Sequence, residues 1–292
     1  MRGDPEAHQL TAPGTLEGVL SLLDREPGEW TPIAGGTELM VAFAAGRLTS
    51  KKLVNLWGIH ELRFIRVSED RLVIGAGSTF RDLRDDLAVS SEFPLLNKAA
   101  GWIGSIANQS RATLGGNLVN GSPAADSSPA LLVYDAEVEM ISIRGRRKIS
   151  YSQFHTGYKR NILAADELLY AIHLPRRFAN HHQYLRKVGT RRAMAIAKTA
   201  LAGTALTEQG IVREIRIAAA SVAAFPTRLY RTEDAVIGQA IGPETIRAAR
   251  AAALAEVAPI DDIRSTAEYR RTVTANLVQE FLSTLFHAGD EQ

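Results

Sequence analysis

The sequence contains no cysteine, and this absence removes several kinds of chemistry. Without cysteine the chain can form no disulfide, no cysteine nucleophile, no thiolate zinc site and no cysteine-held iron–sulfur cluster. It also has no uninterrupted apolar run near the roughly 18 residues of a membrane span, and its start, MRGDPEAHQL, lacks the apolar segment of a signal peptide. We therefore expect a cytoplasmic protein without membrane insertion, in which redox chemistry would require a bound cofactor.

A strong net charge is missing as well. The 34 basic and 32 acidic residues leave a net charge of +2, so binding to nucleic acid gets little support. The seven histidines are scattered, and the adjacent pair His181-His182 would point to opposite sides of an extended segment. We therefore expect no metal site.

The composition is that of an ordinary globular protein, and the chain is long enough for one large domain or two. The apolar spacing predicts a first helix, over 16–23, with Thr15 as its cap. A strand from Trp30 to Ala34, the pair Gly35-Gly36 and a helix ended by Gly46 are predicted to follow.

Further elements follow from the same patterns. Strands are predicted at 53–56, 64–67, 71–75, 137–143, 184–188, 196–206 and 211–219. Helices are predicted at 80–87 and 95–106, and another begins at Ser127-Ser128-Pro129. The connection from Pro175 to Asn180 marks a domain boundary. The last helix begins with the capping box Ser265-Thr-Ala-Glu268, and its apolar stripe is Val273, Leu277, Phe281 and Leu285.

Two glycine turns are the chemically suggestive feature, namely Gly35-Gly36-Thr37 and Thr113-Leu-Gly-Gly-Asn117. Each one places bare backbone N–H groups at a helix start, an arrangement that suits a phosphate. A single Gly-Gly pair is more often a plain turn that requires positive φ. Two such turns in one chain indicate a diphosphate.

Two better-known nucleotide motifs are absent. Gly75-Ala-Gly77 follows a predicted strand, but Phe80 occupies the place of the third glycine of a dinucleotide fingerprint. No glycine-rich loop ends in Gly-Lys-Ser or Gly-Lys-Thr, which excludes a P-loop. Asp126 has two open interpretations, because it could cap the helix near Pro129 or accept hydrogen bonds from ligand hydroxyls.

An ordered set of blocks resembles the FAD-binding medium subunit of the molybdenum hydroxylases, the xanthine dehydrogenase and carbon monoxide dehydrogenase group. The resemblance covers residues 10 to 285. The blocks are Ile33-Ala-Gly-Gly-Thr-Glu-Leu39, Thr113-Leu-Gly-Gly-Asn117, Gly121-Ser-Pro-Ala-Ala-Asp126, Phe154-His-Thr-Gly-Tyr-Lys159, Ala165-Asp-Glu-Leu-Leu169, Lys187-Val-Gly-Thr-Arg-Arg-Ala-Met-Ala-Ile-Ala197 and Ser265-Thr-Ala-Glu-Tyr-Arg-Arg271.

The resemblance implies an α+β fold. It implies an FAD-binding domain of the vanillyl-alcohol-oxidase/PCMH type at 1–177, with subdomains at about 1–57 and 58–177. It further implies a C-terminal medium-subunit domain at 178–292, made of a three-stranded antiparallel sheet and helices. Some relatives carry an extra iron–sulfur cluster in this subunit, and the lack of cysteine excludes it here.

The resemblance also implies which residues hold FAD, while no catalytic residue and no metal ligand is expected. From the residues alone, Leu169 is expected to be a core leucine and Lys187 a solvated charge. Only the family resemblance makes them candidate FAD-binding residues. The implied cofactor-binding residues are Pro32, Ile33, Ala34, Gly35, Gly36, Thr37, Glu38, Leu39, Thr113, Leu114, Gly115, Gly116, Asn117, Asp126, Leu169 and Lys187.

The implied function is electron transfer. Electrons would come from the [2Fe-2S] clusters of a small subunit, after hydroxylation on a large molybdopterin subunit, and pass through FAD to an acceptor such as NAD. The implied assembly is a dimer of heterotrimers. One alternative is a self-contained FAD-dependent oxidase or reductase of the same superfamily, and another is a non-catalytic scaffold. The intact Gly35, Gly36, Gly115 and Gly116 argue against the scaffold.

Overall fold

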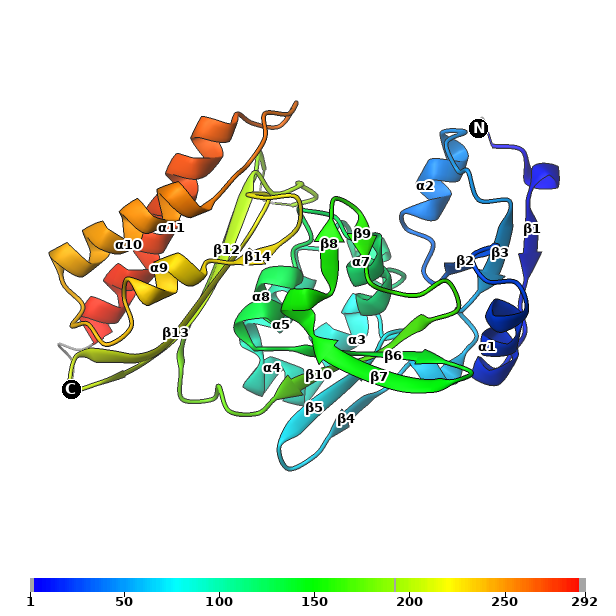
Figure 1. Cartoon of the computed structure of the whole chain (residues 1–292), viewed down its shortest axis with the longest axis horizontal. Helices are drawn as coiled ribbons and strands as arrows, with labels where there is room; N and C mark the ends of the chain where they lie inside the picture. Colours follow the sequence, from blue (N-terminus) through cyan, green and yellow to red (C-terminus); the bar gives the residue numbers. More distant parts are fainter. Residues whose placement is uncertain (1–2, 192, 289–292) are drawn as a thin grey trace.

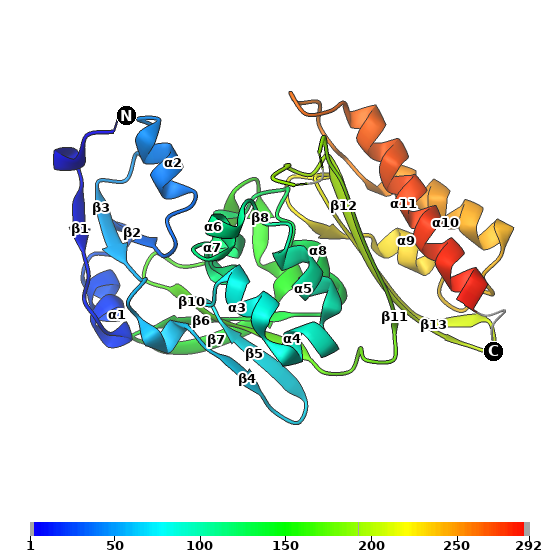
Figure 2. The ribbon, with the colours of Figure 1, turned by 180° about the vertical axis from the view of Figure 1, so that it is seen from behind.

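The computed structural model describes residues 3–191 and 193–288. Three parts lie side by side along the longest axis of the molecule (Figures 1 and 2). A small parallel sheet forms one end, a five-stranded antiparallel sheet with short helices forms the middle, and a four-stranded sheet covered by helices forms the other end. These sheets, each packed with helices, confirm the predicted α+β fold.

The N-terminal part is built on a parallel sheet in the order β1-β3-β2. The predicted cap forms, since the Thr15 hydroxyl accepts a hydrogen bond from the Gly18 N–H at 3.1 Å. The short helix α2 buries none of its side chains. The elements are η1 (Pro5–Ala7), β1 (Gln9–Thr11), α1 (Leu16–Arg25), β2 (Trp30–Ile33), α2 (Leu39–Ala44) and β3 (Lys52–Asn55).

The middle part is an antiparallel sheet in the order β4-β5-β10-β6-β7, with helices packed on one face. The strands are β4 (Ile65–Val67), β5 (Arg71–Gly75), β6 (Glu137–Ser142), β7 (Gly145–Ser150) and β10 (Leu168–Pro175), with a separate hairpin of β8 (His155–Gly157) and β9 (Arg160–Asn161). The helices are η2 (His60–Leu62), α3 (Phe80–Asp85), α4 (Leu87–Glu92), α5 (Pro94–Ala100), α6 (Ile106–Gln109), α7 (Leu114–Asn120), α8 (Ser128–Val133) and η3 (Tyr151–Gln153).

The C-terminal part is an antiparallel sheet whose outer face is covered by two long helices (Figure 1). Helix α11 approaches closely because β12 has Gly203 at the contact, where a Cβ would lie 2.4 Å from the Phe281 ring. The predicted three long strands gain a two-residue fourth, β14. The elements are β11 (His182–Val188), β12 (Thr199–Glu208), β13 (Ile211–Ala220), β14 (Thr227–Arg228), α9 (Tyr230–Asp234), α10 (Pro243–Glu256) and α11 (Ala267–Ala288).

Three local predictions about helices are wrong. The helix predicted over 95–106 ends at Ala100, and a turn separates α5 from α6. The helix predicted over 80–87 breaks at Asp86, which is extended and caps α4 by accepting from the Val89 N–H at 2.9 Å. At the last helix, the hydroxyl of Thr266, rather than that of Ser265, accepts from the Tyr269 N–H.

Helix α8 joins the middle part to the C-terminal sheet, since it packs against β12, β13 and β14. Asp135, directly after α8, pairs with three arginines: Arg177 at 2.6 Å, Arg216 at 2.7 Å and Arg228 at 2.9 Å. The side chains of Arg216 and Arg228 are 12% and 11% exposed. Arg216 is also paired with Glu214 and Arg228 with Glu233, so Asp135 is a shared partner in a partly buried charge cluster. Loss of one charge from such a cluster is destabilising.

We predict that Asp135→Asn lowers the free energy of unfolding by about 2 kcal/mol, because it removes the charge shared by three arginines. Asparagine tolerates the positive φ of +49° at this position, so the backbone should be unaffected. Urea unfolding of the variant measures the loss. The control is Glu208→Gln, which removes an exposed pair with Arg213 and should cost less than about 1 kcal/mol. Equal losses in the two variants would contradict the prediction.

Candidate functional site

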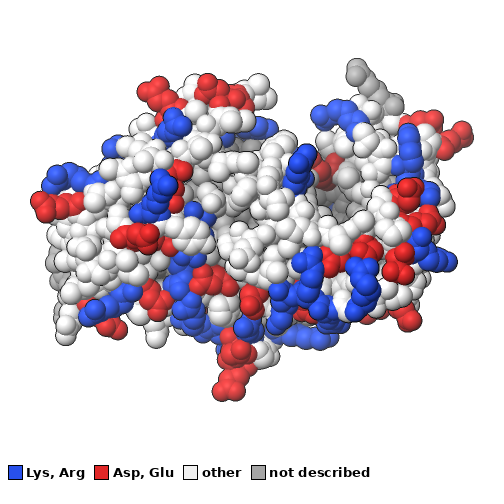
Figure 3. Space-filling view, viewed as in Figure 1, with Lys and Arg blue, Asp and Glu red and all other residues white. Residues whose placement is uncertain are grey.

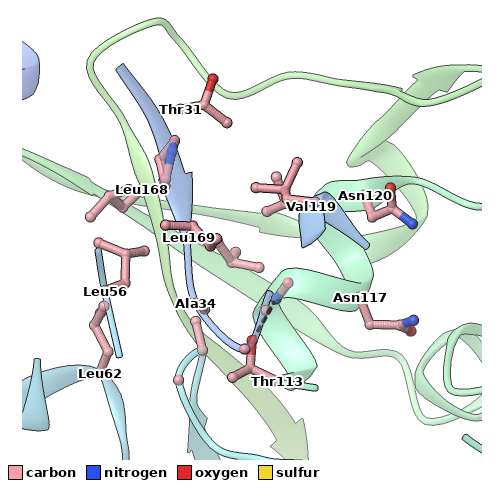
Figure 4. Close-up of a pocket in the computed structure, with 18 of the residues that line it drawn as sticks. Thr31, Ala34, Leu56, Leu62, Thr113, Asn117, Val119, Asn120, Leu168 and Leu169 are labelled. Atoms are coloured by element: carbon pink, nitrogen blue, oxygen red, sulfur yellow. Dashed lines mark hydrogen bonds between the residues drawn. The ribbon is translucent and has the colours of Figure 1, made fainter. Parts of the chain in front are cut away.

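A cavity of about 620 Å³ lies between the N-terminal part and the middle part. Figure 3 shows the surface hollowed beside α2, and Figure 4 shows the interior. The wall comes mainly from four separated stretches, within 30–39, 56–63, 112–120 and 159–169, and it is completed by Leu23, Ala76, Gly77 and Ile103. This volume lies in the range of small-molecule and cofactor sites.

The turn Gly35-Gly36-Thr37, which follows β2, forms one side of the cavity. Its three N–H groups donate no hydrogen bond to any residue that the structure describes. Gly36 has φ +74°, a conformation that glycine adopts without strain. Successive N–H groups without partners, at the wall of a cavity, form a cradle that suits an anion.

Gly35 brings this turn into direct contact with Arg111 and Ala112, which lead directly into the second turn. A Cβ on Gly35 would lie 1.7 Å from the carbonyl oxygen of Arg111 and 3.1 Å from the Ala112 nitrogen. No side chain fits at that distance. The first glycine turn therefore packs, main chain against main chain, on the residues that immediately precede the second turn.

The second turn has its N–H groups already bonded within the protein. The Leu114 N–H donates to the Ser78 carbonyl and the Gly115 N–H to the Ala76 carbonyl, each at 2.9 Å. The Gly116 N–H donates to the Thr113 hydroxyl at 3.0 Å, a bond drawn in Figure 4. What this turn offers a ligand is the exposed backbone of Gly116 and the side chain of Asn117.

The segment Gly75-Ala76-Gly77 supports the second turn, and Ala76 and Gly77 also border the cavity. A Cβ on Gly75 would lie 2.4 Å from the Leu62 carbonyl oxygen, and one on Gly77 would lie 2.9 Å from it. The segment is thus pressed against η2, where it presents the Ala76 carbonyl to the Gly115 N–H. This packing is consistent with the prediction that Gly75-Ala76-Gly77 is not a dinucleotide fingerprint.

The cavity has an apolar end and a polar end (Figure 4). Leu56, Leu62 and Leu168 gather at one side, while Asn117 and Asn120 project from α7 at the other. The Ser127 hydroxyl donates to Asn117 Oδ1 at 2.7 Å, which assigns Nδ2 as a hydrogen-bond donor. This lining suits a ligand that combines an apolar group with an anionic group.

Asp126 and Lys187 form a buried ion pair beyond the polar end. Lys187 Nζ lies 2.6 Å from Asp126 Oδ2, and the two side chains are 11% and 10% exposed. Asp126 Oδ1 is buried with no partner among the described residues. Burial raises the pKa of Asp126 to about 6, and attraction to Lys187 opposes the rise. Asp126 caps no helix, because the N-cap of α8 is Ser127.

Most residues proposed from sequence come together in the wall. Leu114 is fully buried in the core, and Leu169 is 5% exposed while it also borders the cavity. Leu114, Asp126 and Lys187 lie outside the wall. Arg192, which belongs to the block Lys187–Ala197, lies outside the described residues. The proposed residues that line the cavity are Pro32, Ile33, Ala34, Gly35, Gly36, Thr37, Glu38, Leu39, Thr113, Gly115, Gly116, Asn117 and Leu169.

Sequence reasoning missed several wall residues, including Trp57, Lys159, Asn161 and Leu168. Lys159 stands in one of the blocks that carry the family resemblance, so a signal was present for it. Trp57 carries no comparable signal. It stacks with Arg111, whose guanidinium carbon lies 3.9 Å from the ring centroid, and such a contact between distant residues leaves no local pattern.

The described residues contain neither a cluster of metal-ligating side chains nor a membrane-spanning helix. Within residues 3–191 and 193–288, no three histidine, aspartate or glutamate side chains converge as metal ligands would. In the same stretches, every helix is too short or too polar for a bilayer-crossing segment.

Comparison with family models assigns both halves of the chain. Residues 6–177 match the family described as the FAD binding domain in molybdopterin dehydrogenase. Residues 184–285 match the family described as the CO dehydrogenase flavoprotein C-terminal domain.

Individual proteins match over nearly their whole length. The chain is 31% identical over 272 residues to the xanthine dehydrogenase FAD-binding subunit of Escherichia coli O157:H7, covering 91% of this chain and 93% of that protein. It is 30% identical over 249 residues to the nicotinate dehydrogenase FAD-subunit of Eubacterium barkeri, covering 82% and 83%. A solved structure of carbon monoxide dehydrogenase from Hydrogenophaga pseudoflava, lacking the Mo-pyranopterin moiety, superposes with a TM-score of 0.92 at 27% identity, covering 97% and 99%.

We predict that Gly35→Ala lowers the free energy of unfolding by about 1–3 kcal/mol, because the added Cβ forces the first turn away from the segment that leads into the second. Thermal or urea unfolding of the ligand-free protein measures this loss. Gly58→Ala is the matched control, since a Cβ there meets nothing within 4 Å and should change stability by less than about 0.5 kcal/mol. Full stability of Gly35→Ala would mean that this contact is unimportant.

A pH dependence follows from the raised pKa of Asp126, about 6 in the folded chain against an ordinary value of 3.8. Between these values the folded state holds a proton that the unfolded state has lost, so stability falls as the pH rises through this window. Asp126→Asn should therefore lose less stability than the unmodified chain between pH 4 and pH 6. Urea unfolding across this range provides the test, with Asp24→Asn, at an exposed position, as control. Parallel curves for the unmodified chain and Asp126→Asn would refute it.

Proposed function

The chain belongs to the family of FAD-binding subunits of molybdenum-containing dehydrogenases, which are oxidoreductases, and we propose that it relays electrons through one bound FAD inside a multi-subunit complex. The observation that carries the proposal is the contact of the first glycine turn with the segment that leads into the second, at the wall of one cavity. The free N–H groups of the first turn suit the diphosphate of FAD, and the apolar end suits a flat ring.

We propose that the cofactor is held mainly by backbone and neutral side chains. Bound FAD supplies the ability to accept electrons singly and release them in pairs, while the protein sets its position and surroundings. We propose no acid–base residue for this chain. The proposed FAD-binding residues are Pro32, Ile33, Ala34, Gly35, Gly36, Thr37, Glu38, Leu39, Thr113, Leu114, Gly115, Gly116, Asn117, Asp126, Leu169 and Lys187.

Asp126 and Lys187 are proposed to border the FAD site at the polar end. Two contacts support this location, since Ser127 is bonded to Asn117 in the cavity wall and Lys187 Nζ lies 6.0 Å from the Trp102 ring, next to the wall residue Ile103. The ammonium and the unpartnered Oδ1 atom would then be available to polar atoms of the cofactor.

The domain division and the partners are also proposals. We propose an FAD-binding domain at 1–177, with subdomains 1–57 and 58–177, and a C-terminal domain at 178–292. The cavity between the first two units supports this division. We propose that a small [2Fe-2S] subunit donates the electrons, that a large molybdopterin subunit oxidises the substrate, and that NAD accepts the electrons from FAD, in a dimer of heterotrimers. Names such as medium chain, given to relatives, support a complex of several subunits. A cytoplasmic location stays a prediction.

We predict that the chain, purified from its native source, carries about one FAD per polypeptide and co-elutes with two further subunits. Absorbance of released flavin and identification of the co-purified chains measure both. In parallel, Gly116→Val should lose most of its FAD, because it fills the open backbone face beside Thr113. Gly58→Ala serves as control. A colourless protein that takes up no added FAD, or a Gly116→Val variant with full flavin content, would contradict the proposal.

A further inference from the structure

The charged side chains in the cavity wall differ in how firmly they are held. Four line it, namely Glu38, Arg63, Lys159 and Glu167. Arg63 makes two hydrogen bonds to Asp82, at 2.9 and 2.8 Å. Glu167 binds Arg147 at 2.6 Å and the Ala164 N–H at 2.8 Å.

Lys159 and Glu38 are held only by each other, according to the contacts among the described residues. Lys159 Nζ lies 3.0 Å from Glu38 Oε1, and the side chains are 42% and 57% exposed. An exposed ion pair of this kind contributes at most about 1 kcal/mol. The Lys159 ammonium is therefore the cation of the wall that a ligand can recruit at the smallest cost.

The backbone at Lys159 is anchored to the rest of the protein, whereas its side chain is exposed. The residue lies at the turn of the β8–β9 hairpin, and Asn161 Nδ2 anchors this hairpin to α7 by donating to the Val119 carbonyl at 3.1 Å. On the other side, Glu38 directly follows Thr37 of the first glycine turn. The ammonium of Lys159 thus lies beside the turn whose N–H groups have no partner.

We propose that Lys159 is a binding residue for the FAD diphosphate and that Glu38 competes with the phosphates for its ammonium. This inference rests on the proposed FAD function. The diphosphate of FAD carries two negative charges, whereas backbone N–H groups supply only partial positive charge. A charge-assisted bond from an ammonium to phosphate oxygen is stronger than an exposed pair with a carboxylate. Binding of FAD therefore draws Lys159 away from the Glu38 carboxylate, which remains as a repelling charge, so that Glu38 contributes to the proposed FAD site through its main chain only.

The two variants of this pair are expected to act in opposite directions. With FAD-stripped full-length chain, Lys159→Met should raise the FAD dissociation constant about tenfold or more. Glu38→Gln should lower it, because the lysine is then uncommitted. Lys159→Arg should stay near the unmodified affinity, and Lys148→Met, at an exposed position on β7, is the control for a general loss of positive charge. Fluorescence titration with FAD gives the constants, and thermal unfolding confirms that each variant folds.

Riboflavin, which has no phosphate, separates the diphosphate from the ring. Lys159→Met should weaken FAD binding and leave riboflavin binding unchanged. Unchanged FAD affinity in Lys159→Met would overturn the inference. Equal weakening by Lys159→Met and Glu38→Gln would also overturn it, since the pair would then act as a latch over the cavity. Failure of the unmodified chain to bind FAD would instead overturn the proposed function, and this assignment with it.

Discussion

The site depends on one contact between main chains, the packing of Gly35 against the carbonyl of Arg111. This contact joins the N-terminal sheet to the segment that leads into α7, and the cavity exists because the two are held at that spacing. Gly115 makes a similar close contact, because it packs directly on Ala76. Three stretches of nearly bare backbone are thus stacked against each other. The glycines serve the packing of the protein as much as the approach of a ligand.

The sequence was informative about the site where chemistry is local. The two glycine turns could be found because they interrupt regular patterns, and the Thr113 cap forms the bond that its position predicts. The pairing of Lys159 with Glu38 could not be found, because it joins residues that share no element and no spacing rule. Asp126 shows the same limit: its carboxylate was interpreted as a helix cap or as an acceptor for ligand hydroxyls, and its partner in the structure is Lys187 on β11.

Most single helices and strands could be predicted from the sequence, but their arrangement in space could not. The amphipathic pattern predicted α1 and its cap, and the strand predicted at 211–219 corresponds to β13. Helix ends were less certain: α5 ends at Ala100, followed by Gly101 at its C-cap, and Asp86 is extended and caps α4. The position of β10 between β5 and β6 depends on long-range strand pairing, which the spacing of apolar residues does not predict.

The position of α8 has a consequence for how such proteins can be recombined. Its side chains belong to the core of the middle part, yet it packs on three strands of the C-terminal sheet, and Asp135 at its end is shared by arginines from three later segments. A chimaera that exchanged the C-terminal half with that of a relative would divide this charge cluster between two parents. The natural unit of exchange is therefore larger than the C-terminal half, and it includes the helix on which that half rests.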